Sequence, residues 1–386
     1  MLKLFSNRLA PLGSVCEKGI CVRRVSENPK YPPVFRQREY FLVRNHVTQI
    51  PEGFAGYFFF EKPSLDVPEV SYLLEPSLSY LCDGDVVKIN PERGSLRTLY
   101  RRNSAHNSVL VTERCNNYCL MCSQPPRDVN DEHLVAEIMH AIPLMSRETR
   151  YIGITGGEPT LLGERLIDLL KAFRNYLPAT AIHVLSNGRR FESFDYAKAI
   201  ASVRHPDLMI AIPVYSDISS KHDHIVQADS AFDDTIRGII NLKTANVRVE
   251  IRVVLHKLVV ERLPQLARFI RRNLTFCDHV ALMGLEITGF TRSNLEQLWI
   301  DPKDYQPQLK EAVAILHRAR MRVSIYNHQL CILDESLHDF SRKSISDWKN
   351  EFMPECNGCT RKRECGGFFS SAKLRYSSHI MPFHDE

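Results

Sequence analysis

Short hydrophobic runs recur along the middle of the chain, and longer amphipathic stretches separate them. A short apolar run predicts a strand buried on both faces, because such a strand has no side that meets water. The stretches between the runs place apolar residues three or four positions apart, which is the period of an α-helix. We expect strands at 108–112, 151–155, 181–186, 208–213, 248–255 and 279–284, and helices near 132–146, 163–175, 193–203, 231–245, 260–273 and 303–319.

Strands that alternate with helices of this length predict an α/β fold, with a parallel sheet and crossover helices. Residues 323–328 are expected to form one more strand, which leads into a cysteine-rich tail. In parallel α/β barrels the chemistry gathers where the strands end. The residues that directly follow each expected strand are therefore the first candidates for a functional site.

The first part of the chain has no long helical period. It contains short β-rich runs at 40–43 and 57–60, and 83–90 with 95–100 reads as a hairpin. We expect a β-rich accessory domain at 1–105, an α/β unit at 106–320 and a cysteine-rich extension at 321–386. The accessory domain either recruits a peptide by strand addition or covers the α/β unit.

Composition narrows the class of protein. Of 386 residues, 44% are hydrophobic and 25% charged, and the net charge of +5 is too small to indicate a nucleic-acid or membrane partner. No apolar stretch approaches the ~20 residues of a membrane span, and the N-terminus has charges where a signal peptide needs its apolar core. Eleven cysteines in such a chain favour a reducing compartment and metal binding. We expect a cytoplasmic protein.

Three cysteines, Cys115, Cys119 and Cys122, follow the first expected strand of the α/β unit. Thiolates are soft ligands that select zinc, copper(I) or iron–sulfur clusters. Three of them hold three corners of a four-iron cluster and leave one iron open, whereas structural zinc prefers four closed ligands. The spacing alone leaves both metals possible.

The next strand ends in Gly156-Gly157-Glu158-Pro159. Together with the Cys-x3-Cys-x2-Cys loop, this sequence resembles the radical S-adenosylmethionine (SAM) superfamily. The resemblance implies a partial (β/α)6 barrel and a [4Fe–4S] cluster on the three cysteines, whose open iron is chelated by SAM. It implies that the Gly156-Gly157-Glu158 turn receives the amino group of SAM. Met121 stands where family members usually carry an aromatic residue against the adenine, and a thioether can also pack on a ring face.

Two further strand ends suggest cofactor-binding residues. Ser186 and Asn187 follow the third strand, where the family carries a polar residue that faces SAM. Arg252 lies among apolar neighbours in the fifth strand, and an embedded arginine needs an anionic partner. That partner is either the SAM carboxylate or a structural carboxylate.

The fourth and sixth strand ends suggest catalytic residues. Tyr215 and Asp217 follow the fourth strand, at a place where family members present groups to SAM or to the substrate, and Glu286 follows the sixth. His222 and His224 stand just beyond Asp217. They are either proton donors and acceptors near pH 7 or part of a solvated loop.

The tail contains a second group of thiols, Cys356, Cys359 and Cys365, with Cys331 upstream. Four thiolates close all corners of a second cluster or bind one zinc ion. The tail resembles the twitch and SPASM extensions of radical SAM enzymes, which implies an auxiliary [4Fe–4S] cluster. We expect Cys331 to be its fourth ligand, although a substrate group in that place is the alternative.

Residues 105–108, 113–126 and 356–369 resemble the HxsC-type maturases of the bacterial His-Xaa-Ser repeat system. This resemblance implies radical modification of a small precursor peptide with His-Xaa-Ser repeats. It implies two partners besides that peptide, namely a second radical SAM maturase and a low-potential electron donor. A radical SAM enzyme for a small metabolite or RNA, and a non-catalytic zinc or iron–sulfur scaffold, are the alternatives.

Overall fold

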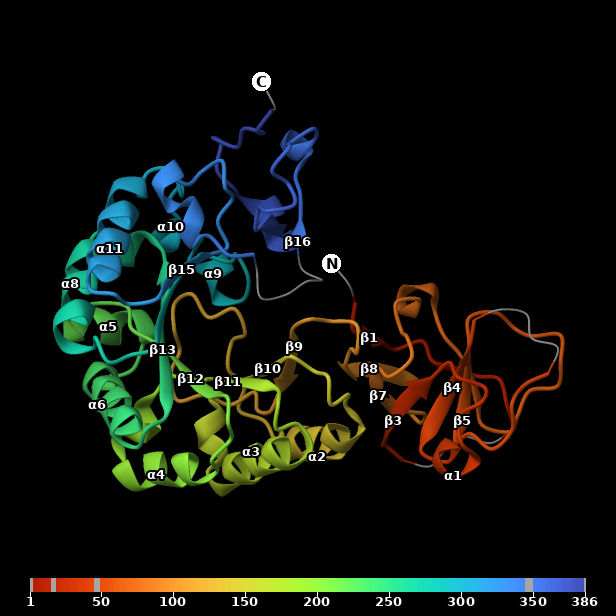
Figure 1. The fold of residues 1–386 in the computed structure, drawn as a ribbon. Coiled ribbons are helices and arrows are strands. Elements are labelled where there is room, and N and C mark those ends of the chain that lie inside the picture. Colours follow the sequence, from red (N-terminus) through yellow and green to blue (C-terminus); the bar gives the residue numbers. More distant parts are fainter. Residues whose placement is uncertain (1–2, 15–18, 45–48, 344–349, 385–386) are drawn as a thin grey trace.

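The computed structural model describes residues 3–14, 19–44, 49–343 and 350–384. In these residues seven strands form one parallel sheet in the order β15-β14-β13-β12-β11-β10-β9 (Figure 1). The strands are β9 (Asn107–Leu110), β10 (Tyr151–Thr155), β11 (Ala181–Leu185), β12 (Leu208–Pro213), β13 (Arg248–Leu255), β14 (His279–Gly284) and β15 (Val323–Tyr326). All six expected strands are confirmed. The seventh, β15, joins the same sheet, so the expected count of six is one short and residues 323–326 belong with the sheet rather than with the tail.

Helices alternate with these strands and lie along the outer face of the curved sheet (Figure 1). The longer ones are α2 (Glu132–Ala141), α3 (Glu164–Tyr176), α4 (Phe194–Ser202), α6 (Ala231–Thr244), α8 (Leu263–Asn273) and α11 (Gln306–Arg318), and the shorter ones are α5 (Ser219–Val226), α7 (Lys257–Val260), α9 (Phe290–Ser293) and α10 (Leu295–Leu298). The helix expected at 132–146 ends at Ala141 and continues as a 3-10 turn. Helix α5 covers the segment for which a solvated loop was one expectation.

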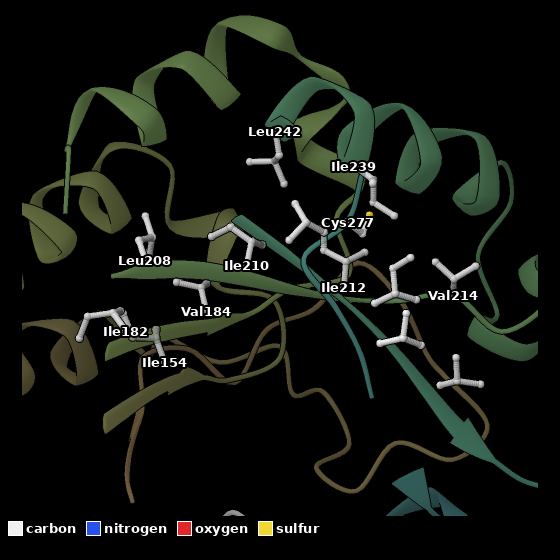
Figure 2. Packing of buried hydrophobic residues seen from close by; sticks show 14 of the residues in the cluster. Ile154, Ile182, Val184, Leu208, Ile210, Ile212, Val214, Ile239, Leu242 and Cys277 are labelled. Atoms are coloured by element: carbon white, nitrogen blue, oxygen red, sulfur yellow. The ribbon is translucent and has the colours of Figure 1, made fainter. Parts of the chain in front are cut away.

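The core lies between the sheet and these helices. Along each strand, alternate side chains point outward, because successive residues of a strand face opposite sides. Ile182 and Val184 of β11 and Ile210 and Ile212 of β12 are fully or almost fully buried in one cluster, and Figure 2 shows Ile212 below Ile239 of α6. The other set of side chains points into the lumen, so polar lumen residues such as Glu250 alternate with core residues along the same strands.

The described residues before β9 are rich in short strands, and the domain boundary at 105 remains a prediction. These strands make one eight-stranded sheet in the order β1-β8-β7-β3-β4-β5-β6-β2. They are β1 (Phe5–Ser6), β2 (Ala10–Pro11), β3 (Cys21–Ser26), β4 (Glu39–Val43), β5 (Gly56–Phe59), β6 (Ser71–Leu73), β7 (Val86–Asn90) and β8 (Ser95–Tyr100), with the four-residue helix α1 (Pro33–Arg36). The expected hairpin is β7–β8. Both edge strands are only two residues long, which leaves a short edge for strand addition.

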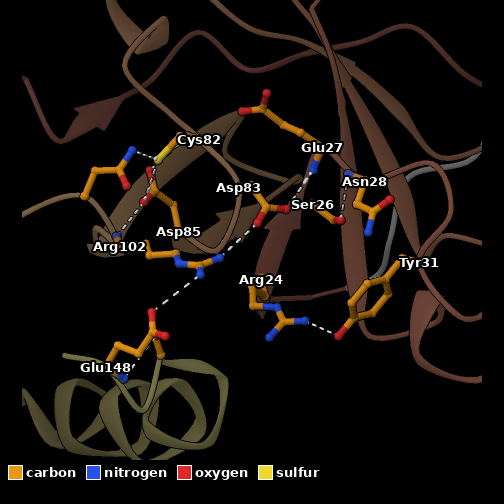
Figure 3. A network of polar contacts seen from close by, with 12 residues as sticks. Arg24, Ser26, Glu27, Asn28, Tyr31, Cys82, Asp83, Asp85, Arg102 and Glu148 are labelled. Carbon is orange, nitrogen blue, oxygen red and sulfur yellow. Dashed lines mark hydrogen bonds and ion pairs between the residues drawn. The ribbon is translucent and has the colours of Figure 1, made fainter.

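This domain packs against the parallel unit. Tyr100 donates or accepts a 2.8 Å hydrogen bond with Thr149 across the junction. Arg102 lies between Asp83, at 3.1 Å, and Glu148 of the parallel unit, at 3.7 Å (Figure 3). Lys88 forms an ion pair with Glu137 of α2. The β-rich domain therefore has its own core and also covers one side of the α/β unit.

The tail is held by the short pair β16 (Asn350–Glu351) and β17 (Phe368–Phe369). Ile332, Met353, Phe368 and Ile380 are buried together and form its small core. In the described residues no helix is both long and apolar enough to cross a membrane.

Candidate functional site

The loop of Cys115, Cys119 and Cys122 leaves the C-terminal end of β9 and crosses the edge of the sheet. Two of its backbone N–H groups donate to the end of α5, from Tyr118 to Val226 at 3.0 Å and from Leu120 to Ile225 at 3.0 Å. The three thiols are half-buried. Burial raises the pKa of Cys115 to about 11, and it also raises the pKa of Cys119 and Cys122. Without metal the three groups are protonated at neutral pH, so metal binding would release their protons.

The far side of the cysteine loop is fixed by the turn after β14. The amide of Phe290 donates to the carbonyl of Cys122 at 2.8 Å. Thr291 Oγ1 donates to the carbonyl of Met121 at 3.1 Å, and Asn294 Nδ2 donates to the carbonyl of Leu120 at 2.9 Å. We call these three donors the α9 clamp. Sequence reasoning missed these contacts. The glycine at position 289 was the one sequence signal for a tight turn before α9, and its φ in the structure is +54°.

The turn at Gly156 and Gly157 packs directly on the cysteine loop. A Cβ atom on Gly156 would lie 2.5 Å from the carbonyl oxygen of Thr112, and one on Gly157 would lie 2.1 Å from the carbonyl oxygen of Arg114. The amide of Gly157 donates to Thr112 at 2.9 Å. No side chain fits at either position, so the backbone itself forms the surface beside the cysteines. The structure brings together the two motifs on which the family resemblance depends.

Glu158 is fully buried, and its carboxylate is surrounded by donors. Oε1 accepts from Thr160 N at 2.9 Å, Thr160 Oγ1 at 2.6 Å and Ser186 Oγ at 2.8 Å, and Oε2 accepts from Asn187 N at 2.6 Å. Burial raises its pKa, and these hydrogen bonds oppose that rise. A carboxylate oxygen has about two acceptor sites, so Oε1 is saturated and Oε2 keeps one site. Glu158 thus joins the ends of β10 and β11, and its contact with the amino group of SAM remains a prediction.

Ser186 and Asn187 are therefore placed by Glu158. Asn187 also reaches the cysteine loop, because its Nδ2 donates to Asn116 Oδ1 at 2.6 Å. Arg189 adds another hydrogen bond to the cysteine loop, because its Nη1 donates to Asn117 Oδ1 at 3.1 Å. Asn116 was not singled out from the sequence. Both expected residues lie at the site, and their contact with SAM remains a prediction.

Tyr215 lies beside the cysteines, whereas Asp217 has another partner. Burial raises the pKa of the Tyr215 hydroxyl, and the nearby thiols of Cys119 and Cys122 raise it further. Asp217 accepts two hydrogen bonds from Arg262, at 3.0 and 2.6 Å, and these lower its pKa. This bidentate pair gives Asp217 a structural role at the start of α8, so of the two expected catalytic residues Tyr215 is the one near the loop.

The buried imidazole of His222, in α5, serves the backbone. Its Nδ1 accepts from the amide of Tyr215 at 3.2 Å, and burial lowers its pKa to about 4. The ring is therefore neutral at pH 7. His222 positions the end of β12 and is not a proton donor at that pH.

Arg252 and Glu250 point into the lumen, two residues apart on β13. Arg252 Nε donates to Glu250 Oε1 at 2.5 Å, and Glu250 Oε2 is 2.6 Å from His279 Nδ1. Burial alone would raise the pKa of Glu250, but the hydrogen bond from His279 and the charge of Arg252 lower it to about 2. Arg252 thus has a structural carboxylate as a partner, and its contact with the SAM carboxylate remains a prediction.

The remaining expected residues occupy different surroundings. Met121 is buried and packs in the main core beside the cysteine loop. Glu286 is half-buried and lines a cleft between the end of β14 and the tail. The expected roles of Met121 at the adenine and of Glu286 in catalysis stay predictions.

The four tail cysteines, Cys331, Cys356, Cys359 and Cys365, line one cavity with about 340 Å³ of empty space. Arg361 and Lys362 are also part of its wall. The four thiols therefore share one space, part of which is open to solvent. Within the described part of the chain, no three His, Cys, Asp or Glu side chains converge closely enough to hold one metal ion.

Comparison with known proteins gives one family match. Residues 109–270 match the model of the Radical SAM superfamily. That segment contains the cysteine loop, the Gly156-Gly157 turn and the strands β10 to β13. None of the curated proteins matches the chain.

Solved structures show a distant likeness of fold. SuiB from Streptococcus suis is 14% identical with a TM-score of 0.43, and the match covers 61% of this chain and 51% of SuiB. The structure of anSMEcpe with bound AdoMet is 18% identical with a TM-score of 0.44, covering 56% and 63%. A radical SAM methyltransferase from Sphaerobacter thermophilus is 16% identical with a TM-score of 0.41, covering 64% and 70%. The chain therefore spans about half the length of SuiB.

Proposed function

We propose that this chain, whose residues 109–270 form a radical SAM domain, is an enzyme that modifies a ribosomally made peptide. The observation that carries the proposal is the packing of the Gly156-Gly157 turn on the loop of Cys115, Cys119 and Cys122. Three soft ligands and the half-buried backbone of the glycine turn then lie together at the C-terminal end of a parallel sheet.

The donor set fits the cofactors of the family. Cys115, Cys119 and Cys122 would hold three irons of a [4Fe–4S] cluster, and the backbone at Gly156 and Gly157 would receive the amino group of SAM. When bound, the cluster and SAM supply a 5′-deoxyadenosyl radical that abstracts a hydrogen atom from an unactivated carbon.

The chain's own residues orient these groups and exclude water. The α9 clamp, the α5 contacts and Asn187 hold the cysteine loop from three sides. Tyr215 and Met121 are buried next to it and keep solvent from the thiols. We propose that Tyr215 and Glu286 face the substrate. Asp217 is kept only as a weaker candidate because Arg262 holds both of its oxygens.

We further propose a second [4Fe–4S] cluster on Cys331, Cys356, Cys359 and Cys365. Hydrogen abstraction leaves a substrate radical that must lose one electron and one proton to form a new bond or a double bond. Cys331, Cys356, Cys359 and Cys365 would hold a cluster able to take up such an electron, and an external low-potential donor would supply the electron that starts each turnover. The shared cavity of the four cysteines supports this assignment.

The proposed substrate is a small precursor peptide with His-Xaa-Ser repeats, and a second radical SAM maturase is the proposed partner. Support for both comes from the resemblance of residues 105–108, 113–126 and 356–369 to HxsC-type maturases. The small net charge supports a peptide over RNA.

The test is anaerobic incubation of the purified protein with SAM, dithionite and a synthetic peptide of three His-Xaa-Ser repeats. Chromatography should detect 5′-deoxyadenosine, and mass spectrometry should detect a mass change in the peptide. Cys115→Ala should abolish both products, whereas Cys277→Ala, at an isolated buried thiol, should keep them. Colourless wild-type protein that contains zinc and forms no 5′-deoxyadenosine would refute the class. Formation of 5′-deoxyadenosine with an unchanged peptide would refute the substrate.

A further inference from the structure

The parallel sheet ends in two edge strands, β15 and β9, and only one of them is covered in the part of the chain that the structure describes (Figure 1). At β15, Ile325 forms a parallel bridge with Ser341, and the amide of Arg342 donates to the carbonyl of Ile325 at 2.8 Å. At the other end, β9 pairs with β10 alone. Among the described residues the sheet therefore has one covered edge and one open edge.

The backbone groups that face the open edge belong to Ser108 and Leu110. In a strand of a parallel sheet, the N–H and C=O groups of successive residues point to opposite sides. The amide of Val111 donates to the carbonyl of Thr155 at 2.9 Å, so the odd-numbered residues of this segment bond to β10. Ser108 and Leu110 point their N–H and C=O groups away from β10. In the described chain these groups have no hydrogen-bond partner.

This edge is accessible and longer than the edges of the β-rich domain. Ser108 is exposed and Leu110 is half-buried. Val109 and Val111 are buried in the main core, so the side chains of Ser108 and Leu110 lie on the opposite, lumen side. An unpaired strand edge is a template for another strand. The two edge strands of the β-rich domain have two residues each, whereas β9 has four, so β9 is the better template.

The open edge leads directly to the proposed radical site. Leu110 is only five residues before Cys115, so an extended segment laid along β9 would have one end beside the cysteine loop. A row of N–H and C=O groups at strand spacing is matched by another extended backbone. A small metabolite or an RNA has no such row. The chemistry of this edge therefore indicates a peptide.

We infer that the reacting segment of the peptide substrate binds in extended form along β9 and adds a strand to the parallel sheet. The inference rests on the proposed function and adds the mode of substrate binding to it. The amides of Ser108 and Leu110 donate to carbonyls of the peptide, and their carbonyls accept from its amides. Because side chains alternate along a strand, every second residue of the bound segment faces the barrel lumen.

Binding is measured on the anaerobic holoenzyme with SAM and without reductant, by fluorescence anisotropy of a fluorescein-labelled peptide with two His-Ala-Ser repeats. Methylation of one backbone amide of the peptide at a time removes a donor and adds bulk. It should weaken binding by about tenfold or more at every second position and by less than about threefold at the positions between. A period of two in a peptide whose sequence repeats every three residues is the signature of an added strand.

On the protein side, Ser108→Pro removes one N–H group that faces the open edge. It leaves the hydrogen bonds to β10 in place, because proline lacks only the donor and is tolerated in edge strands. The loss of one backbone hydrogen bond should weaken peptide binding by about threefold to tenfold. Ser108→Ala is the matched control, because it removes the same hydroxyl and keeps the N–H group. It should leave the affinity unchanged.

Hydrogen exchange at single-residue resolution on the wild-type holoenzyme tests the same groups without a substitution. The amides of Ser108 and Leu110 should exchange quickly without peptide and slowly with saturating peptide. The amide of Val111 should be protected in both states, because it donates to β10. Protection of Ser108 and Leu110 before peptide is added would show that another segment of the chain or a second copy occupies the edge, and it would overturn the inference.

Three other results would overturn it as well. They are no binding of the peptide to wild type, methylation effects without the two-residue period, and equal affinities of folded Ser108→Pro and Ser108→Ala. Failure of the proposed function is a separate observation, since it is absence of 5′-deoxyadenosine after reductant is added to wild type.

Discussion

Gly157 and Cys115 lie so close together that a Cβ atom on the glycine would stand 3.0 Å from the Cβ of the cysteine. Contacts of this length are tighter than ordinary packing, and the carbonyl of Arg114 would be closer still. The two motifs of the domain are therefore one packed unit.

Gly157→Ala should displace the cysteine loop. Overpacking of a tight site costs about 1–3 kcal/mol, and the displaced loop should bind less iron and cleave little SAM. Iron and sulfide analysis with the ~400 nm absorbance measures the first effect. The control is Gly153→Ala in β10, the strand that precedes Gly157, where the nearest atom is the rotatable hydroxyl of Ser108 at 3.2 Å. Normal iron content in Gly157→Ala would contradict the packing argument.

Glu158→Gln should destabilise the fold even without SAM. The substitution replaces one of the two carboxylate oxygens with an NH₂ group, which cannot accept, so at least one of the donors from Thr160, Ser186 and Asn187 loses its acceptor. Leaving buried donors without an acceptor should lower the free energy of unfolding by roughly 2–4 kcal/mol, measured by urea denaturation. Glu164→Gln, at an exposed position of α3, should change it little. If the two variants unfold alike, Glu158 does not join the strands.

The double variant Cys356→Ala/Cys359→Ala should separate the two proposed clusters. It should lose about half of the iron, keep the first cluster and still form 5′-deoxyadenosine, because the first cysteine loop is untouched. Peptide modification should fall sharply, because the proposed electron acceptor is absent. Iron analysis, chromatography and mass spectrometry measure the three outcomes. Undiminished modification by a folded double variant with one cluster would rule out the acceptor role.

Glu250 should contribute to stability at neutral pH and lose that contribution in acid. Its pKa falls from a usual value of 4.5 to about 2 in the folded chain, so the unfolded state binds more protons between these values. Because the folded state binds fewer protons in this range, the ionised Glu250 adds about 3 kcal/mol to the free energy of unfolding. This contribution is complete above pH 4.5 and is lost as the pH falls toward 2.

Urea unfolding of wild type and Glu250→Gln at several pH values measures this contribution. The difference between the two proteins should shrink as the pH drops below 4.5. Glu311→Gln removes a carboxylate from an exposed ion pair with Arg268 and should show little difference at any pH. A difference for Glu250→Gln that stays constant with pH would contradict the assignment.

The hydrophobic pattern of the sequence predicted the strands well, and it also indicated that the residues following them would meet. Short apolar runs were enough to place the seven parallel strands, and the residues after β9 and β10 do meet at one edge of the sheet. Such predictions succeed because they depend on residues close in sequence and on the geometry shared by parallel sheets.

Contacts between distant segments were not predictable in the same way. Nothing near Thr291 in the sequence shows that it holds the cysteine loop, and nothing near Asn116 shows that this loop residue accepts a hydrogen bond from Asn187. Glu158 was expected to lie at the site, but its hydrogen bonds from Ser186 and Asn187, 28 and 29 residues away, could not be predicted. Arg252 was left between two partners, and only the fold shows which carboxylate stands beside it.

The α9 clamp has a consequence for how the protein is made. Thr291 and Asn294 reach back 170 and 174 residues to Met121 and Leu120. A nascent chain that has left the ribosome only as far as β14 has all three cysteines of the loop but none of the groups that brace its far side. Iron insertion into a correctly shaped loop therefore has to wait until about three quarters of the polypeptide has been synthesised.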